Sequence, residues 1–339
     1  QLCNYMDVFN NATINNSITF MKSTASEKEI KDFKLIKGDV LLTKDSEVPE
    51  EIGMPSVLNE NIDDLICGYH LYLLRMKNSI LCPEYLCWTL RSNQSRQYFY
   101  QMANGSTRFG LNLGHVSKCL IPFPPLPEQK KIADILSCGY EFIKSIENKI
   151  EKLKFLKESI KSECFSYKSD HSIQIKKLKD ICSVRQGLQI PIANRSNAIG
   201  ENKLPYLTTA WINSDFAISK AEYIDSPKES VILKDDEFVV GRTGSVGKIF
   251  DGMRCVFHNN FFAVSPKKEV LKHYLMHYLT WKVVQTEILK RAGTTTIPDL
   301  NHGDFYSINI PVPEIDKQIK IISKINSINK LILSNQSCK

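Results

Sequence analysis

The stretch IPFPPLPEQKKIADIL, residues 121–136, returns in altered form as IPVPEIDKQIKIISKI at residues 310–325. The two copies share prolines, isoleucines, a glutamine and a lysine at one constant offset along the chain. The matching pairs are Ile121 and Ile310, Pro122 and Pro311, Pro124 and Pro313, Gln129 and Gln318, Lys131 and Lys320, and Ile132 and Ile321. A repeat of this kind predicts that the chain contains two copies of one structural unit.

The similarity continues upstream of the proline motif, so each copy belongs to a larger unit. Three further pairs of segments correspond: KGDVLLTKDS (37–46) with DDEFVVGRTG (235–244), CPEYLCWTLRS (82–92) with LKHYLMHYLTW (271–281), and NGSTRFGLN (104–112) with AGTTTIPDLN (292–301). Each unit is predicted to contain strands, a helix near 84–102 or 271–290, a Gly-Ser/Thr loop, a strand entering the proline motif, and a second helix. The period of about 190 residues is too long for a solenoid and predicts duplicated α+β domains.

The composition allows two folded domains and narrows the protein's environment. The chain has 339 residues, of which 42% are hydrophobic and 24% charged, enough for two cores without disulfides or metals. Its net charge of +7 permits an anionic partner such as nucleic acid without requiring one. The 10 cysteines are scattered with no C-x-x-C pair, as expected for reduced thiols. No apolar run reaches the roughly 20 residues of a membrane helix and no signal-peptide pattern opens the chain, so we expect a soluble, cytoplasmic protein with no membrane partner.

Each proline motif is predicted to lead into a long helix. Prolines exclude helix up to Pro127, which suits a first helical turn, and Glu128 follows at the positive end of the helix. Apolar residues then recur at alternating spacings of four and three, as in a coiled-coil seam. The predicted seam residues are Ile132, Leu136, Ile143, Ile146, Ile150 and Leu153 in the first helix, and Ile321, Ile325, Ile328 and Ile332 in the second. An amphipathic helix on a globular core is the alternative, but the dense charges between these positions favour two helices that pair antiparallel.

The order of these elements resembles the specificity (S) subunit of type I restriction-modification enzymes. The resemblance rests on two domains of unlike sequence, each closing with GST or GTT, then LN, IP-x-P and a Gln-Lys-Ile helix, and it covers nearly the whole chain. It implies an α+β fold in which two mixed α/β target-recognition domains are joined by two long helices that form an antiparallel coiled coil. The implied boundaries are 1–126 for the first recognition domain, 127–168 for the central spacer helix, 169–314 for the second recognition domain and 315–339 for the C-terminal spacer helix.

The resemblance also implies a function without catalysis. Each recognition domain would read one half of a split double-stranded DNA sequence, and the paired helices would act as a ruler. The subunit would dock two methyltransferase subunits, which would carry the S-adenosylmethionine, and restriction (nuclease-translocase) subunits would join for cleavage. The chain itself would need no cofactor and no metal. A helix over residues 128–165 would span about 55 Å, comparable with the ~34 Å between half-sites one duplex turn apart plus the width of the domains. Because the two units differ in sequence, the predicted target is asymmetric.

The beginning of the first unit departs from this pattern. The second unit opens with KLKDICSVRQGLQI (177–190), which is similar to the family's domain start. The first unit opens with QLCNYMDVF, a segment that corresponds to the second unit from about Leu207 onward, and the chain has no initiator Met. We therefore expect that about 30 residues of a family-like opening are missing, through trimming or through an abbreviated first domain.

Three features suggest other chemistry, and each fits it poorly. GRTGSVGKIF (241–250) approaches a P-loop, but its spacing is one residue too long and Ile249 stands where Ser or Thr would hold Mg²⁺. His273 and His277 lack the Glu of an H-E-x-x-H zinc motif, so a pair on a helix surface is favoured over a metal site. No N/D-P-P-Y/F motif or glycine-rich cofactor loop of an amino-methyltransferase is present, which supports a subunit that directs others.

Candidate DNA contacts are polar and basic residues in the loops of both units. In the first unit these are Lys44, Ser46, Ser106, Thr107 and Arg108; in the second they are Arg185, Gln189, Arg195, Asn197, Arg242, Thr243, Ser245, Lys248, Thr294, Thr295 and Thr296. For each residue the alternative is a solvated loop position, and for the 241–250 loop it is a structural glycine hairpin. Two other functions stay open: a coiled-coil scaffold whose variable domains bind proteins, and the severed specificity part of a fused restriction-methylation enzyme.

Overall fold

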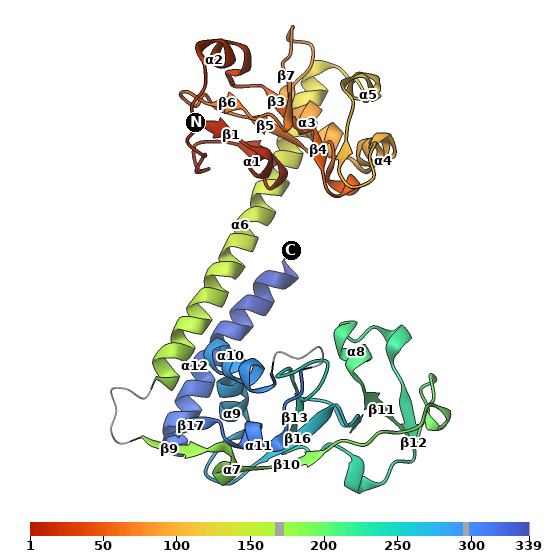
Figure 1. Cartoon of the computed structure of the whole chain (residues 1–339), viewed down its shortest axis with the longest axis vertical. Coiled ribbons are helices and arrows are strands. Elements are labelled where there is room, and N and C mark those ends of the chain that lie inside the picture. The colour runs from red at the N-terminus through yellow and green to blue at the C-terminus, as the bar shows by residue number, and fades with distance from the viewer. Residues whose placement is uncertain (167–172, 294–297, 339) are drawn as a thin grey trace. The chain divides into compact units, whose positions relative to one another are not determined.

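The computed structural model describes residues 1–166, 173–293 and 298–338, which fall into two units, Gln1–Ser145 and Ile146–Lys339 (Figure 1). Helix α6 (Leu126–Phe165) begins in the first unit and ends in the second. Each unit has its own sheets and its own hydrophobic core, so each is described by itself.

The first unit is organised around a four-stranded sheet in the order β2-β5-β3-β7. Side chains of the central strand β3 alternate between two cores: Leu41 packs with Val8 and Ile14 on one face, whereas Leu42 packs with Phe99 on the other. The strands are β1 (Leu2–Cys3), β2 (Thr13–Ile14), β3 (Val40–Thr43), β4 (Asp45–Ser46), β5 (Pro55–Leu58), β6 (Ile66–Cys67), β7 (Leu71–Leu74) and β8 (Phe109–Gly110). The helices are α1 (Tyr5–Phe9), α2 (Glu27–Phe33), α3 (Pro83–Arg91), α4 (Asn93–Met102) and α5 (Leu113–Lys118).

The second unit has a four-stranded sheet in the order β10-β16-β13-β14 and a three-stranded sheet in the order β12-β11-β15. Its central strand β13 alternates in the same way, with Phe238 and Val240 in one core and Val239 in another. The strands are β9 (Gln174–Lys177), β10 (Cys182–Gln186), β11 (Lys203–Leu207), β12 (Tyr223–Asp225), β13 (Phe238–Gly241), β14 (Ile249–Phe250), β15 (Val256–Phe257), β16 (Phe261–Pro266) and β17 (Asn309–Val312). The helices are α7 (Leu178–Ile181), α8 (Thr209–Asn213), α9 (Lys272–Leu279), α10 (Lys282–Arg291), α11 (His302–Tyr306) and α12 (Ile315–Ser337).

Strand pairing confirms the repeat predicted from the sequence. In the first unit Val40 of β3 lies opposite Leu74 of β7, and in the second unit Phe238 of β13 lies opposite Val264 of β16. The parallel pair of β1 and β6 likewise corresponds to the parallel pair of β11 and β15. Strand β1 therefore matches the end of β11 near Leu207, where the sequence comparison placed it. Strands β9 and β10 have no counterpart among the described residues of the first unit.

A buried glutamine explains why the proline motif is repeated. The side chains of Gln129 and Gln318 are both 0% exposed. Gln129 accepts a hydrogen bond from the backbone N–H of Cys82 at 2.9 Å and donates to the carbonyl oxygens of Ile80 and Pro124 at 3.1 and 2.9 Å. Gln318 makes the same three bonds, to Leu271, Glu269 and Pro313, at 2.9, 2.9 and 2.8 Å. The glutamine thus ties the start of each long helix to the domain that precedes it, because its carboxamide satisfies backbone groups from both.

The single helix predicted before each Gly-Ser/Thr loop is wrong in both units. In the first unit α3 ends at Arg91 and α4 begins at Asn93, because Ser92 adopts an extended conformation and its side chain caps α4 by accepting from the N–H of Ser95. In the second unit α9 and α10 are separated in the same way by Thr280 and Trp281, of which Trp281 is extended. Both helices of each pair still pack on one core: Leu86 and Phe99 share a core in the first unit, as Tyr274 and Ile288 do in the second.

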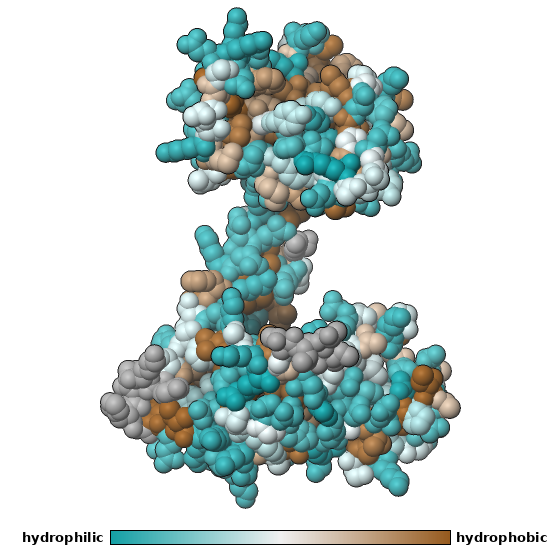
Figure 2. All heavy atoms as spheres, in the orientation of Figure 1, coloured by the Kyte–Doolittle hydropathy of each residue, from teal (hydrophilic) through white to brown (hydrophobic). Residues whose placement is uncertain are grey.

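Helices α6 and α12 pair antiparallel within the second unit. Ile146 and Ile150 of α6 pack with Ile332 of α12, and farther along α6 Glu163 lies 3.2 Å from Lys324. Later residues of α6 therefore face earlier residues of α12, which makes the pair antiparallel. Leu153 and Ile328 flank this apolar cluster. With 40 residues, α6 is about 60 Å long at 1.5 Å per residue. The visible middle of α6 is mainly hydrophilic in Figure 2, in keeping with the charges between its apolar positions.

Other predicted seam positions have different surroundings. Ile132 packs against Cys82, Tyr85 and Ala133 of the first unit, where it helps to fix the start of α6. Leu136 and Ile143 are 43% and 41% exposed. The remaining two seam positions lie in the main core of the second unit, together with the aromatic residues of α9; they are Ile321 and Ile325. The cluster formed by the two helices alone is therefore shorter than the predicted seam, because some seam positions pack into domain cores and Leu136 and Ile143 are exposed.

Candidate nucleic-acid interface

Three loop segments meet at the end of the central strand in each unit. In the first unit they are residues 43–46, 68–71 and 108–112, and in the second they are residues 241–248, 258–261 and 298–301; we call each set a loop frame. The frames are held by equivalent backbone hydrogen bonds. The N–H of Lys44 donates to the carbonyl of His70 at 2.9 Å, and that of Arg242 donates to Asn260 at 2.7 Å. The carbonyls of Lys44 and Arg242 accept from Leu111 and Leu300 at 2.8 and 3.0 Å.

The first loop frame carries an ion pair and an exposed aromatic ring. Arg108 donates to Asp45 at 2.6 Å, and the Nδ1 atom of His70 lies 2.9 Å from the same carboxylate. Burial by itself would raise the pKa of Asp45, but the bonds to His70 and Arg108 outweigh it and lower that pKa below its ordinary value. Tyr69 is 81% exposed, and the Nζ atom of Lys44 lies 3.9 Å from the centre of its ring.

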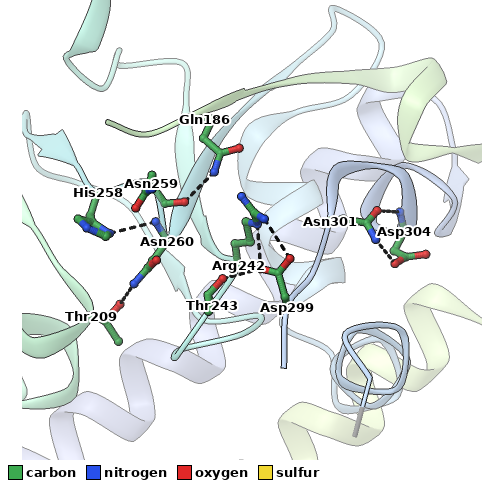
Figure 3. A network of polar contacts seen from close by, with 10 residues as sticks. All are labelled: Gln186, Thr209, Arg242, Thr243, His258, Asn259, Asn260, Asp299, Asn301 and Asp304. Carbon is green, nitrogen blue, oxygen red and sulfur yellow. Dashed lines mark hydrogen bonds and ion pairs between the residues drawn. The ribbon is translucent and has the colours of Figure 1, made fainter. Parts of the chain in front are cut away.

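The second loop frame carries the corresponding ion pair in the opposite direction (Figure 3). Arg242 donates to both carboxylate oxygens of Asp299 at 2.9 and 3.0 Å, and the hydroxyl of Thr243 donates to the same group at 2.5 Å. The bond from Arg242 is the main reason that the pKa of Asp299 is lowered. In the first frame the arginine comes from the loop before the cap of α5, whereas in the second it comes from the loop after the central strand.

The loop 241–250 is a hairpin and has no P-loop geometry. It connects β13 to β14, whose residue Ile249 pairs antiparallel with Val240, whereas a P-loop leads into a helix. Gly244 and Gly247 have φ values of +73° and +75°, which favour glycine and close the loop tightly. The structure thus supports the glycine-hairpin alternative for the loop's shape.

Two polar side chains of this hairpin face helix α8. Ser245, which is buried, and Lys248, which is exposed, donate to the same side-chain oxygen of Asn213 at 2.9 and 3.0 Å. Asn213 closes α8, so this contact ties the hairpin to that helix. The Lys248 ammonium keeps donors for an external anion, because it has three and this bond uses one.

Two predicted DNA contacts are part of the domain's own structure. The guanidinium of Arg185 donates to both carboxylate oxygens of Glu237, at 3.0 and 2.6 Å, and to the carbonyls of Ser230 and Ile232. That of Arg195 donates to the carbonyl of Ile190 and to Glu222, and it lies over the ring of Tyr206; the side chain is 17% exposed. Because these groups are occupied, we assign both arginines to the fold and leave them out of the proposed interface.

The remaining predicted contacts fall into three groups. Ser46 is buried and donates to Glu51 at 2.7 Å, which makes it a structural residue. Four predicted contacts are exposed on loops, where they are free to meet a ligand: Ser106, Thr107, Gln189 and Asn197. Three others lie outside the described residues: Thr294, Thr295 and Thr296.

The sequence comparison did not select the turn that contributes most to each loop frame. This turn is Gly68–Leu71 in the first unit and His258–Phe261 in the second, and in both the fourth residue donates its N–H to the carbonyl of the first. The turn immediately precedes β7 or β16, and strand pairing offsets these turns by one residue more than the proline motif, so the motif's offset does not bring them together. Their side chains differ at every polar position, which hid the correspondence.

A polar cavity of about 390 Å³ lies next to the second loop frame. Its lining includes His258 and Asn260 of the frame together with Thr208, Lys220 and Glu222. Burial is the main reason that the pKa of His258 is lowered, and the charge of Arg195 adds to this effect, so the imidazole is neutral near pH 7. The cavity offers hydrogen-bond donors and acceptors, such as those of Thr208, Lys220 and Glu222, which suits a polar ligand.

The histidine pair of α9 does not form a metal site. The Nε2 atom of His277 donates to the side-chain oxygen of Asn326 on α12 at 2.9 Å, and burial lowers the pKa of His277 to about 4. His273 is exposed and lies 3.8 Å from Asp251. Across the part of the chain that the structure describes, no cluster of three or more His, Cys, Asp or Glu side chains could hold a metal ion, and no helix is long and apolar enough to cross a bilayer.

Comparison with known proteins identifies the family to which this arrangement belongs. The model of the type I restriction modification DNA specificity domain matches residues 3–154 and again residues 171–337. The chain belongs to this family. It is a DNA specificity subunit with two recognition domains, a non-catalytic component of type I restriction-modification systems.

Individual relatives support the same assignment. The chain is 26% identical to the putative type I restriction enzyme MjaX specificity subunit of Methanocaldococcus jannaschii over 326 residues, covering 90% of this chain and 75% of the relative. It is 22% identical to the type I restriction enzyme MjaVIII specificity subunit of the same organism, covering 89% and 75%. Its fold is similar to the crystal structure of the type I restriction-modification S subunit of M. genitalium, with a TM-score of 0.62 at 16% identity over 90% of this chain and 79% of that one.

Proposed function

We propose that this specificity subunit reads a bipartite, asymmetric sequence in double-stranded DNA, with one loop frame for each half. The observation that carries the proposal is that both frames keep the same backbone hydrogen bonds while their side chains differ. Two sites with the same backbone shape can bind the same kind of ligand, and their different side chains can recognise two different short sequences in it.

The side chains of the frames are suited to phosphates and base edges. In the first frame, Lys44 and Arg108 are the basic groups, and Arg108 is 60% exposed. In the second, Lys248 has an unused capacity to donate, while Arg242 presents a guanidinium already oriented by Asp299. An oriented guanidinium loses less entropy on binding and is matched to the paired acceptors of guanine or of a phosphate.

We further propose that α6 and α12 fix the separation of the two half-sequences and that the chain acts in the cytoplasm with other subunits. Two methyltransferase subunits would dock on it and supply the S-adenosylmethionine, and restriction subunits would join for cleavage. The domain limits 1–126, 127–168, 169–314 and 315–339 are the corresponding proposal for its parts. The pairing of Ile146 and Ile150 with Ile332 supports a helix pair of defined length.

The direct test is selection from a pool of random-sequence duplexes by the chain together with its methyltransferase partner, followed by sequencing of the retained DNA. We expect two short defined sequences separated by a spacer of fixed length and undefined sequence. Enrichment of no split motif would contradict the proposal and favour a scaffold whose variable domains bind proteins.

A further inference from the structure

The two turns of the loop frames place one side chain each in an equivalent position with few internal partners. In the second unit this residue is Asn259, between His258 and Asn260 (Figure 3). In the first unit the same position, fixed by the pairing of the following strand, is held by Tyr69. The side chains next to them in each turn, in contrast, make hydrogen bonds within the protein.

The other side chains of the second turn are occupied. The Nδ1 atom of His258 accepts a hydrogen bond from the backbone N–H of Asn260 at 3.1 Å. The side chain of Asn260 donates to Thr209 at 3.2 Å, and its carbonyl accepts from Arg242 and Thr243. Removing either side chain from these contacts for a ligand would cost hydrogen bonds that hold the frame together.

The carboxamide of Asn259 makes fewer hydrogen bonds within the protein than these neighbouring side chains. Its nitrogen lies 3.5 Å from Oε1 of Gln189, at the limit of a hydrogen bond, and its Oδ1 atom is buried without a hydrogen-bond partner among the described residues. Its backbone carbonyl, in contrast, accepts from the side chain of Gln186 at 2.8 Å, so the backbone of the turn is held in place. A fixed backbone that carries such a side chain is suited to recognition, because turning the carboxamide toward a ligand gives up only the 3.5 Å contact with Gln189 and frees Oδ1 from a site where it has no partner.

The equivalent residue of the first unit is also unoccupied at its polar end. Tyr69 is 81% exposed, and its hydroxyl makes no hydrogen bond among the described residues. Its ring lies beneath the ammonium of Lys44 and against the edge of His70, with ring centres 5.2 Å apart. The neighbouring His70 is bound to Asp45 and Arg108, as Asn260 is bound to Thr209 in the second unit.

We propose that Asn259 reads an adenine in the second half of the DNA target and that Tyr69 is the base-reading residue at the same position of the first domain. This inference rests on the proposed function and names the side chains that distinguish the two halves. A carboxamide has one acceptor and two donors, which match the N6 amino group and N7 atom of adenine in the major groove. The exposed ring of Tyr69 presents an apolar edge and a hydroxyl, a different surface on an equivalent turn. The two half-sequences therefore differ at the base pair that faces this position.

Duplex selection with the methyltransferase partner tests the inference through Asn259→Ala, Asn259→Asp and Tyr69→Ala. Asn259→Ala should lower the preference for adenine at one position of the second half-sequence by at least about fivefold, because a bidentate contact is removed. Asn259→Asp keeps the size of the side chain but accepts only, so adenine should lose its advantage at the same position. Tyr69→Ala should relax one position of the first half-sequence alone.

The half-sequence read by the unaltered domain serves as an internal control for folding in each variant. Asn202→Ala is the matched control, because Asn202 is exposed and precedes β11, whereas the turn His258–Phe261 follows β15, which pairs with the opposite end of β11. Its motif should be unchanged. Retention of full adenine preference by Asn259→Ala, or relaxation in the first half-sequence, would overturn the inference while leaving the proposed function intact. Absence of any split motif with the unaltered chain would instead overturn both.

Discussion

The two loop frames differ in their side chains and agree in their backbone. In the first, Arg108 of the third segment binds Asp45 of the first segment; in the second, Arg242 of the first segment binds Asp299 of the third. The ion pair joins the same two loops in both units with its charges exchanged. Backbone hydrogen bonds and one Arg–Asp pair, with the arginine on either loop, are therefore enough to fix the backbone of the loop frame. The other side chains of the frame are free to differ.

A second difference concerns the acidic residue before the central strand. Asp39 is buried in the first unit and accepts two bonds from Arg75, both at 2.7 Å. Its counterpart Glu237 accepts from Ser265, which holds the place of Arg75, and from Arg185 on β10. The described part of the first unit has no strand equivalent to β10. Among the described residues, Arg75 thus holds the acid of the first unit, whereas Ser265 and Arg185 hold that of the second.

The largest effect is expected where the units agree, at the buried glutamines. Gln129→Ala and Gln318→Ala should each lower the free energy of unfolding of the adjoining unit by about 3 kcal/mol, since each leaves one backbone N–H and two carbonyls without a partner. Denaturant unfolding of the full chain would measure both. Gln101→Ala, at an exposed position of α4, should change it by less than about 0.5 kcal/mol. Equal small effects of all three variants would show that the glutamine does not fasten the helix to the domain.

A smaller effect is expected where the units differ, at Glu237. Burial alone would raise its pKa, but bonds from Arg185, the N–H of Lys234 and Ser265 lower it below the ordinary value of 4.5. A carboxyl whose pKa is lower in the folded state stabilises the fold above its unfolded pKa, and this contribution is lost as pH falls below about 4.5 toward the folded value. Glu237→Gln should remove about 2 kcal/mol at neutral pH and weaken the acid dependence below that pH.

Thermal unfolding between pH 3 and 7 would measure this dependence for the second unit. The exposed Glu201 supplies the control, because Glu201→Gln removes the same charge from the surface of the same unit. An acid dependence that is the same in Glu237→Gln and in the unaltered chain would show that this carboxyl does not contribute it.

The smallest effect concerns the basic residues of the frames. If Lys248 and Arg242 each contact one phosphate, replacing either with alanine should make the slope of log affinity against log salt shallower by about one unit. Lys44→Ala and Arg108→Ala should do the same for the first frame. Lys228→Ala serves as a control on an exposed loop of the second unit. A slope that is unchanged in both variants of one frame would place that frame away from the DNA backbone.

The sequence predicted the repeat, the long helices and the family, because these depend on patterns of prolines and apolar residues that local physics makes visible. It also placed candidate contacts at Arg242 and Lys248, which lie on the second frame. It could not predict that Arg185 and Arg195 are bound internally, since their partners Glu237 and Glu222 are distant in the chain. Which arginines are fully engaged within a domain appears only once the fold has brought their carboxylate and carbonyl partners together.

The turns of the frames were missed for a related reason. Tyr69 and Asn259 have no chemical similarity, so only strand pairing shows that they hold one position. The role of Gln129 was likewise invisible, although its repetition was not, because the three backbone groups that it binds come from two separate segments. Hydrogen bonds between a side chain and backbone groups far away in the chain leave little trace in the local sequence.

The central claim is that two recognition domains read two half-sequences at a distance fixed by the helices. Insertion of seven residues after Ile150 in α6 and of seven between Ile328 and Ile332 in α12 keeps the apolar stripe in phase and lengthens each helix by about 10.5 Å, or roughly three base pairs. Three base pairs also rotate the second half-site by about 100°, so binding should weaken. Mapping of methylated sites with the partner methyltransferase would measure the result. The account predicts unchanged half-sequences with a longer spacer, whereas an active variant with an unaltered spacer would contradict it.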